Sequence, residues 1–286
     1  MSNISEGKNK NTRVNLCYIL VILLKISFVN LFNLKNLRNL ISYNSEIYLI
    51  IQGNETQNLL SNEFYIEPSE VYINGVLDIS CKKTCYLTED ENNITLNFLS
   101  QLVSFENMFL NLDNIIEVDL SNFDTSMITT MSSMFKNCNN LVSVNLSNST
   151  TNSLINMSYM FSLCSSLEII DFGNINTSLV EDMRYLFSEC SSIQSIDISQ
   201  FDISKVINMS FMFHNCSSLE AIDFGTINTS LVEDMQYLFS GCSSIQSIDI
   251  SQFDTSKITN MIYMFHKCKN LKSLNFPILI LPRLEI

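Results

Sequence analysis

The feature that most constrains this chain is a repeat of 26 residues. Cysteines recur at this interval six times: Cys138, Cys164, Cys190, Cys216, Cys242 and Cys268. Methionines share the interval from Met131 to Met261, and phenylalanines share it from Phe109 to Phe265. A fixed period between about 20 and 50 residues is typical of a solenoid, in which one repeat buries its apolar face only against a neighbour. We therefore expect Met, Phe, Cys, Leu and Ile to form one core layer per repeat.

The repeats also show a longer period. Residues 165–216 match residues 217–268 at 42 of 52 positions, so the most recent duplication copied a pair of repeats. The chain has only 6 Gly and 3 Pro, so the many corners of such a stack must be made by Asn, Asp, Ser and Thr.

Within one repeat, the pattern predicts a helix and a strand. Apolar residues have helical spacing over residues 179–189, and Ser178 with Glu181 forms a Ser-x-x-Glu capping box at the start. The following run SSIQSIDIS alternates Ile196 and Ile198 with polar residues, as a half-buried strand does. The expected fold class is an α/β repeat solenoid, with one short strand and one short helix per 26-residue repeat.

The repeat resembles a known pattern. The run MFxxCxxLxxIDxSxFDTSxVxNM, present with local variation from Met212 to Met235 and again from Leu238 to Met261, is similar to the repeat of BspA-like leucine-rich-repeat surface proteins. The similarity covers Phe105 to about Phe276, with departures such as Leu112 in place of the first Cys and Pro277 at the end. It implies a leucine-rich-repeat-like solenoid on a cell-surface or secreted protein, and it offers no catalytic residues.

The period is lost at both ends, which predicts four segments. Residues 1–45 are basic and then apolar, and residues 105–276 form the solenoid. Between them, residues 46–104 contain three runs rich in Ile, Tyr, Val and Phe, which predict a small β cap over the first apolar layer. Residues 277–286 form a carboxy-terminal tail.

The amino terminus has two interpretations. Three basic residues precede the nine-residue apolar run 16–24, which is the order of a secretory signal. No small-x-small cleavage site follows, and Lys25 interrupts a span that would be only marginally long enough for a membrane. The segment is either a signal or anchor, with membrane attachment through residues 14–32, or a buried helix of a cytoplasmic protein.

The cysteines and histidines do not predict a metal site. Each periodic cysteine shares its inward face with Phe and Ile, where a free thiol behaves as a small hydrophobic group. Cys81 and Cys85 in CKKTC form either a disulfide or two free thiols, depending on the compartment. His214 and His266 each precede a cysteine by two residues, and we expect them to be surface histidines rather than ligands.

Two columns are candidates for binding. Asp171, Asp197, Asp223 and Asp249 occupy the outward position of successive strands, about 4.8 Å apart, so like charges line one face. Either solvent screens this face, or a cation or basic partner binds it. An aromatic column on the expected helix side is either packing or a ligand platform, and its members are Tyr159, Tyr185, Phe211, Tyr237 and Tyr263.

Composition and motifs limit the function. The chain has 29 acidic and 16 basic residues, a net charge of −13, which argues against nucleic-acid binding. It contains no nucleophile elbow, phosphate loop or paired-carboxylate pattern, so we expect no catalytic residue, metal or cofactor. The expected function is a non-enzymatic recognition or adhesion surface outside the cell that binds a protein or cell-surface ligand. The alternative is an intracellular leucine-rich-repeat-like scaffold for protein–protein interaction.

Overall fold

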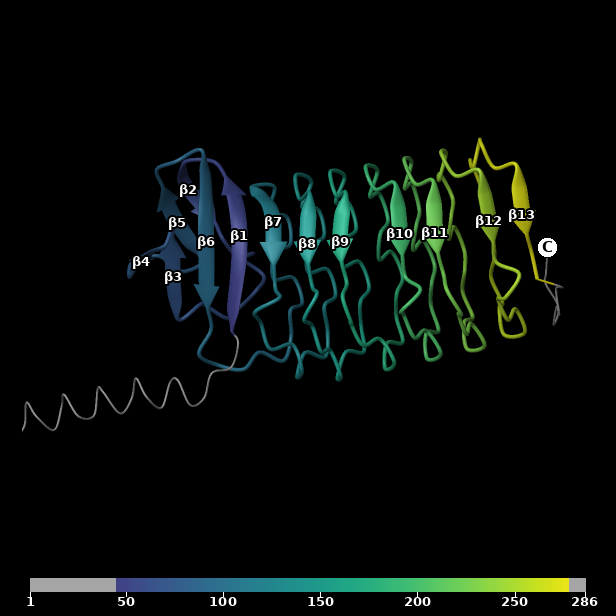
Figure 1. The fold of residues 1–286 in the computed structure, drawn as a ribbon, viewed down its shortest axis with the longest axis horizontal. Helices are drawn as coiled ribbons and strands as arrows, with labels where there is room; N and C mark the ends of the chain where they lie inside the picture. Colours follow the sequence, from purple (N-terminus) through teal and green to yellow (C-terminus); the bar gives the residue numbers. More distant parts are fainter. Residues whose placement is uncertain (1–44, 278–286) are drawn as a thin grey trace, which may run out of the picture. The chain divides into compact units, whose positions relative to one another are not determined.

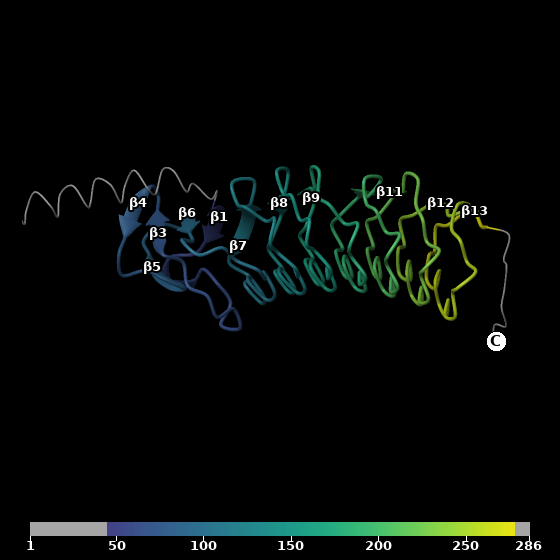
Figure 2. The same ribbon diagram turned by 90° about the horizontal axis from the view of Figure 1, so that it is seen from below.

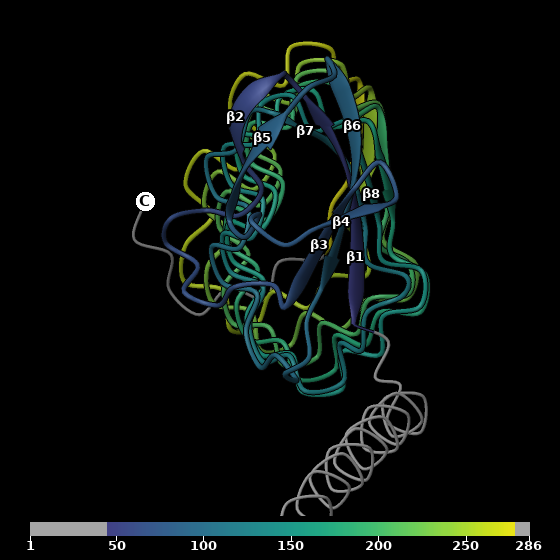
Figure 3. The same ribbon diagram turned by 90° about the vertical axis from the view of Figure 1, so that its left-hand side faces the viewer.

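The repeats form a β-solenoid in which each turn of 26 residues, termed a coil, stacks on the next. The computed structural model describes residues 45–277. The chain divides into two units, residues 1–43 and 44–286, and the described residues lie in the second. Figure 1 shows the strands of successive coils side by side, and Figure 2 shows the same stack after a quarter turn. In the end-on view of Figure 3 the coils superimpose, as expected of a solenoid.

The described residues contain thirteen strands. Six form the amino-terminal module: β1 (Glu46–Gln52), β2 (Glu55–Asn58), β3 (Glu70–Ile73), β4 (Val76–Asp78), β5 (Thr84–Leu87) and β6 (Glu91–Asn97). Seven follow at one per coil: β7 (Ile115–Asp119), β8 (Ser143–Asn145), β9 (Ile169–Asp171), β10 (Ser195–Asp197), β11 (Ala221–Asp223), β12 (Ser247–Asp249) and β13 (Ser273–Asn275).

Strand β1 joins the amino-terminal module to the first coil. It pairs antiparallel with β6 on one side and with β7 on the other, within a sheet of order β4-β3-β6-β1-β7-β8-β9. Ile47, Leu49 and Ile51 alternate inward along it and are buried, as the period of a half-buried strand requires. The edge of the first coil strand is therefore covered by hydrogen bonds to β1 rather than exposed.

The coil strands pair in parallel, but the ladder breaks at regular places. Within residues 45–277, no pairing joins β9 to β10 or β11 to β12. Each break follows an Asp-Phe-Gly sequence, in which Gly173 has a φ of 50° and lies so close to Ser147 that a Cβ would clash with its backbone. Gly225 repeats this arrangement 52 residues later, so the breaks follow the duplicated pair of coils.

The expected helix at residues 179–189 is wrong, because this segment is a ribbon of tight turns. Tyr185 and Glu189 have φ values of 56° and 65°, which a right-handed helix excludes. The Leu186 N–H donates to the carbonyl of Met183, three residues back, and the Tyr185 N–H donates to Ser210 in the next coil at 3.0 Å. The expected capping box does not form either, since the Glu181 N–H donates to Ile155 in the preceding coil. The part of the chain that the structure describes contains no helix, so the fold is a β-solenoid rather than an α/β solenoid.

The stacking distance explains why no helix forms. An α-helix with its side chains is about 10 Å wide, roughly twice the spacing between neighbouring strands. Parallel bridges from Asn156 to Asp182 and from Asp182 to Asn208 hold the ribbon side of the coils at strand spacing as well, so there is no room for one helix per coil. Along the ribbon, alternate N–H groups donate to the next coil and the others donate within a turn. The backbone polar groups therefore find hydrogen-bond partners while the coils stay at strand spacing.

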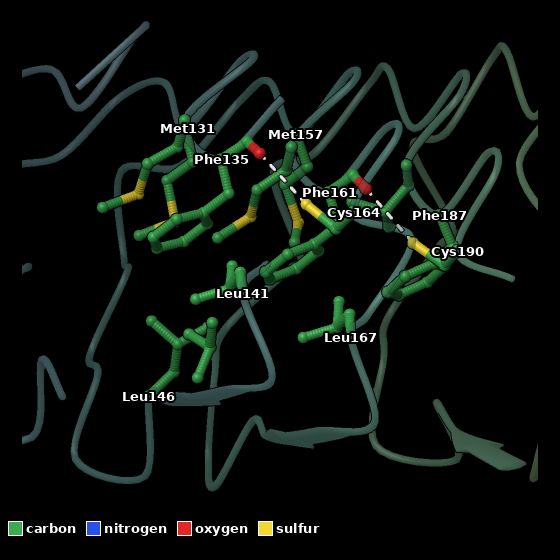
Figure 4. Packing of buried hydrophobic residues seen from close by; sticks show 14 of the residues in the cluster. Met131, Phe135, Leu141, Leu146, Met157, Phe161, Cys164, Leu167, Phe187 and Cys190 are labelled. Carbon is green, nitrogen blue, oxygen red and sulfur yellow. Dashed lines mark hydrogen bonds between the residues drawn. The ribbon is translucent and has the colours of Figure 1, made fainter. Parts of the chain in front are cut away.

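The core is one continuous stack of apolar layers, as the 26-residue spacing predicts. Its centre is a ladder of near-parallel phenylalanine rings with centroids 5.4–5.8 Å apart: Phe109, Phe135, Phe161, Phe187, Phe213, Phe239 and Phe265. Beside it, the Cys164 thiol donates to the carbonyl oxygen of Phe135, and Cys190 does the same to Phe161 (Figure 4). Each coil thus repeats the same contacts with the coil before it.

The segment proposed for membrane attachment, residues 14–32, lies outside the described residues. Between residues 45 and 277 the structure has no helix that could cross a membrane.

Candidate functional site

The structure places the four candidate aspartates in corresponding positions of one wall. Asp171, Asp197, Asp223 and Asp249 are the last residues of β9, β10, β11 and β12, and all four are exposed. Asp197 is directly opposite Asp223 in the parallel register. The wall beside them is built from short side chains such as Ser195, Ala221 and Ser247. The column expected from the sequence is therefore present as an exposed line of carboxylates along the strand wall.

Each of these aspartates also closes a turn. One carboxylate oxygen accepts the backbone N–H two residues further on, at 2.9 Å from Gly173 to Asp171 and at 2.9 Å from Ser199 to Asp197. Such Asx turns let the chain leave the strand without glycine. Sequence reasoning missed this structural role. The sequence signal for this role was that Asn replaces Asp in the same column. The amide oxygen of Asn145 accepts the Ser147 N–H in the same way.

Asx turns also form the other corners of the coil. At the second corner, Asp202 accepts from the Ser204 N–H at 2.9 Å. At the third, Asn208 accepts from the Ser210 N–H at 2.9 Å, and parallel bridges join this corner from coil to coil. The prediction that Asn, Asp, Ser and Thr make the corners is confirmed by these hydrogen bonds.

Hydrogen bonds at the corners keep several carboxylates ionised. The pKa of Asp197 is lowered because its carboxylate accepts hydrogen bonds from the side chain and backbone of Ser199. The pKa of Asp249 is lowered first by the side-chain amide of Asn275, at 2.9 Å, and then by Ser251. At the second corner, Ser204 lowers the pKa of Asp202 in the same way. On the strand wall, Asp197 and Asp249 therefore keep their negative charge to a lower pH than an ordinary aspartate does.

The aromatic column is a closed stack. Neighbouring rings of Tyr159, Tyr185, Phe211 and Tyr237 lie 4.4–4.6 Å apart and within 10° of parallel. The Nζ of Lys136 lies 4.7 Å from the centre of the Tyr159 ring at one end. The faces of these four rings are thus covered, which favours the packing interpretation over a ligand platform. Tyr263 differs, because its ring is tilted by 40° from that of Tyr237 and is 56% exposed.

The cysteines are part of the core. Burial raises the pKa of Cys138 and of Cys242 to about 12, and it raises the pKa of Cys190 further above its ordinary value. Thiols in this state are poor nucleophiles and poor metal ligands. The structure joins Cys81 and Cys85 by a disulfide. No group of three or more His, Cys, Asp or Glu side chains within residues 45–277 is arranged to hold a metal.

The structure brings together the two histidines, which sequence reasoning treated as separate surface residues. His214 and His266 line one hollow of about 400 Å³, with Ser240 from the coil between them. The Nδ1 of His214 lies 3.6 Å from a carboxylate oxygen of Glu189. The signal in the sequence was their separation of 52 residues, which places them at the same corner two coils apart.

Comparison with known protein families gives one match. The model described as "Mycoplasma protein of unknown function, DUF285" matches residues 103–220 and again residues 190–276. These ranges cover more than half of the chain and include all seven coil strands. No curated protein and no solved structure matches the chain.

Proposed function

We propose that this chain, which belongs to the DUF285 family of Mycoplasma proteins of unknown function, is a non-enzymatic recognition or adhesion protein. The observation that carries the proposal is the strand wall, where exposed carboxylates recur in four successive coils, beside short side chains in three of them. A regular wall of this kind offers many equivalent contacts to one extended partner. The resemblance of the repeat to BspA-like surface proteins supports the same function.

The partner that fits this wall is a protein or cell-surface ligand with basic groups. In Asp171, Asp197 and Asp223, one carboxylate oxygen closes the turn, and the exposed carboxylate can also accept from a partner. A single exposed ion pair contributes only about 0–1 kcal/mol, so affinity must come from several aligned carboxylates acting together. The buried thiols, which donate to core carbonyl groups, support a function without nucleophilic catalysis.

We place the protein at the cell surface or outside the cell, attached or exported through residues 14–32. The disulfide between Cys81 and Cys85 supports this location, because disulfides persist in oxidising compartments. The alternative is an intracellular scaffold for protein–protein interaction. The free state of the six periodic cysteines favours that alternative, since free thiols are the rule in a reducing compartment.

Protease treatment of intact cells tests the location. A carboxy-terminal tag on the full chain is expected to disappear when intact cells are treated, while a cytoplasmic marker protein survives. Survival of the tag in intact cells, together with its loss after permeabilisation, would establish the scaffold alternative instead.

A charge-matched pair of variants tests the wall. Replacing Asp171, Asp197, Asp223 and Asp249 with Asn keeps the Asx turns and removes four charges from the wall. The control replaces four corner aspartates outside the wall with Asn: Asp124, Asp202, Asp234 and Asp254. Binding of a lysine-rich peptide at low salt should weaken more for the wall variant than for the control. Equal weakening would show that net charge, rather than the wall, attracts the peptide.

A further inference from the structure

A second side-chain column runs along the turn ribbon, four residues after the aromatic column. Its members all have positive φ, and they are Asn111, Asn137, Leu163, Glu189, Asn215, Gly241 and Lys267. Polar neighbours in this column bond to each other across coils, as from the Asn137 amide to the Asn111 oxygen at 3.0 Å and from the Asn215 amide to Glu189 at 2.8 Å. From residue 111 to residue 267, only Gly241 lacks a side chain, so it interrupts the column.

Next to this position lies a hollow of about 400 Å³ that both histidines line. Ser240, which is buried, lines it from the coil that contains Gly241, while His214 and Asn215 come from the coil before. The coil after contributes His266, Lys267 and Tyr263. The volume lies in the range of about 300–1,000 Å³ that is usual for small-ligand pockets. The hollow is thus lined by side chains that can donate hydrogen bonds.

The charge around the hollow is opposite to that of the chain. The net charge of the protein is −13, but residues 253–276 carry four lysines and one acidic residue, Asp254. Within the described chain, no carboxylate lies within ion-pair distance of the Lys267 ammonium group. One oxygen of the nearby Glu189 carboxylate is engaged, since it accepts from the Asn215 amide and faces His214. A negative group in the hollow would therefore meet a lysine whose charge is not neutralised.

We infer that this hollow binds an oxyanion group, such as a phosphate, sulfate or carboxylate. Lys267 supplies the charge, His266 supplies a ring N–H donor, and His214 adds a second donor when its ring is protonated, while Tyr237 and Tyr263 lie at the border. The site goes beyond the proposed function, because it uses neither the acidic strand wall nor a location outside the cell. Failure of either proposal leaves the other standing.

His214 makes the binding depend on pH. Burial lowers the pKa of His214, the charge of Lys267 lowers it further, and Glu189 raises it. His214 is therefore neutral at pH 7, and it becomes charged at a lower pH than an ordinary histidine does. Phe211 and Tyr237 are the other rings in contact with it, and neither carries charge at this pH. Oxyanion binding should strengthen as the pH falls from 7.5 to 5.5, and a bound oxyanion should raise the pKa of His214.

The chain has only two histidines, so imidazole NMR signals report on this hollow alone. The experiment titrates the full-length protein with inorganic phosphate, and in separate arms with sulfate and acetate, at constant ionic strength. Saturable shifts of both histidines are expected in at least one arm. Shifts that are reproduced by sodium chloride alone, or an absence of shifts in all three arms, would overturn the inference.

Two variants sharpen the test. Lys267→Ala should weaken oxyanion binding about tenfold or more, which is the usual effect of losing a hydrogen bond to a charged group. Lys257→Ala is the control, because Lys257 is exposed in the same coil but does not line the hollow. Equal affinity of the Lys267 variant and its control would contradict the assignment.

The duplicated coil supplies the second variant. Gly241→Glu introduces the residue type that the equivalent position, Glu189, has 52 residues earlier. The φ of Glu189 is 65°, which shows that the backbone accepts a side chain there. The new Cβ would clash with the side-chain oxygen of Asn215 and lie 3.1 Å from its Cα, so the Asn215 side chain has to turn away. This variant should fill the hollow, place a carboxylate in it and abolish oxyanion binding. Retained binding by a folded Gly241→Glu protein would refute the site, and the Lys267 comparison decides the question if that variant does not fold.

Discussion

At the scale of single residues, the aspartates of the coil serve two purposes. One carboxylate oxygen of Asp197 closes the turn after β10 by accepting the Ser199 N–H at 2.9 Å, and the charge of the same group contributes to the acidic wall. The turn needs only an acceptor oxygen, which Asn supplies equally well at Asn145. The charge is what distinguishes Asp from Asn at this position, so the two purposes can be separated by substitution.

The first prediction separates them at Asp197. Asp197→Ala removes the acceptor and should lower the free energy of unfolding by about 0.5–1.5 kcal/mol, the net value of one hydrogen bond. Asp197→Asn keeps the acceptor and should change the free energy of unfolding much less. Urea denaturation of the two variants and the parent measures this difference. An equal loss in both variants would mean that the charge, rather than the turn, stabilises the fold.

The second prediction concerns acid. Asp197, Asp202 and Asp254 have lowered pKa values in the folded protein, because each accepts hydrogen bonds from the turn that it closes. The pKa of Asp249 is lowered first by the Asn275 side chain and then by its own turn. Their stabilising contribution is present above the unfolded pKa, near 3.9, and is lost as the pH falls through the folded pKa. The melting temperature should therefore fall below about pH 4. A variant with Asn at all four positions should show a smaller fall between pH 5 and pH 3, and a profile identical to the parent would contradict this explanation.

At the scale of elements, the turn ribbon replaces the expected helix. Two residues in each complete ribbon have left-handed backbone angles, such as Tyr159 and Leu163, with φ values of 58° and 66°. Side chains with a Cβ adopt this conformation at a cost of about 1–2 kcal/mol each. The ribbon persists because neighbouring coils supply the hydrogen bonds that hold it, as from the Leu163 N–H to Ser188 at 2.7 Å.

The third prediction distinguishes a ribbon from a helix. Leu163→Gly removes the left-handed strain and should leave the free energy of unfolding unchanged or raise it by up to about 1 kcal/mol. The same change in a helix would lower stability by about 1 kcal/mol. The control is Ile155→Gly, a similarly exposed position without positive φ, which should be destabilising. A clear loss of stability for Leu163→Gly in urea denaturation would count against the ribbon.

At the scale of the whole described unit, stability is organised along one dimension. Every interior coil contacts a coil before and a coil after it, so the Phe187 ring stacks on Phe161 and Phe213 at 5.8 and 5.6 Å. Phe265 stacks on Phe239 alone within the ladder and is only partly buried. The same residue type in the same register therefore has a different environment at the end of the stack.

The fourth prediction compares these two phenylalanines. Phe187→Ala should lower the free energy of unfolding by about 3–5 kcal/mol, whereas Phe265→Ala should cost clearly less. Hydrogen exchange should show the loss of protection concentrated in the coils next to the substitution, as expected when stability is a sum of neighbouring interfaces. Equal costs at the two positions, or a uniform loss of protection along the unit, would contradict the layered core.

The sequence by itself determined which residues recur at equivalent positions of the coils. The 26-residue interval requires each apolar layer to be covered by an equivalent layer, so the buried column of Phe187 and Cys190 and the exposed column of Asp197 could both be predicted. The scarcity of glycine likewise predicted corners made by polar side chains. Each of these inferences depends on the chemistry of a residue and on its place in the period.

Only the tertiary structure decided where the backbone hydrogen bonds go. Apolar residues three and four positions apart occur both in a helix and in consecutive tight turns, so the spacing over residues 179–189 could not distinguish them. The N–H of Tyr185 bonds to Ser210 because a second coil lies at strand spacing, where a helix does not fit. The hollow beside Gly241 has the same origin, since His214 and His266 become neighbours only when the coils stack.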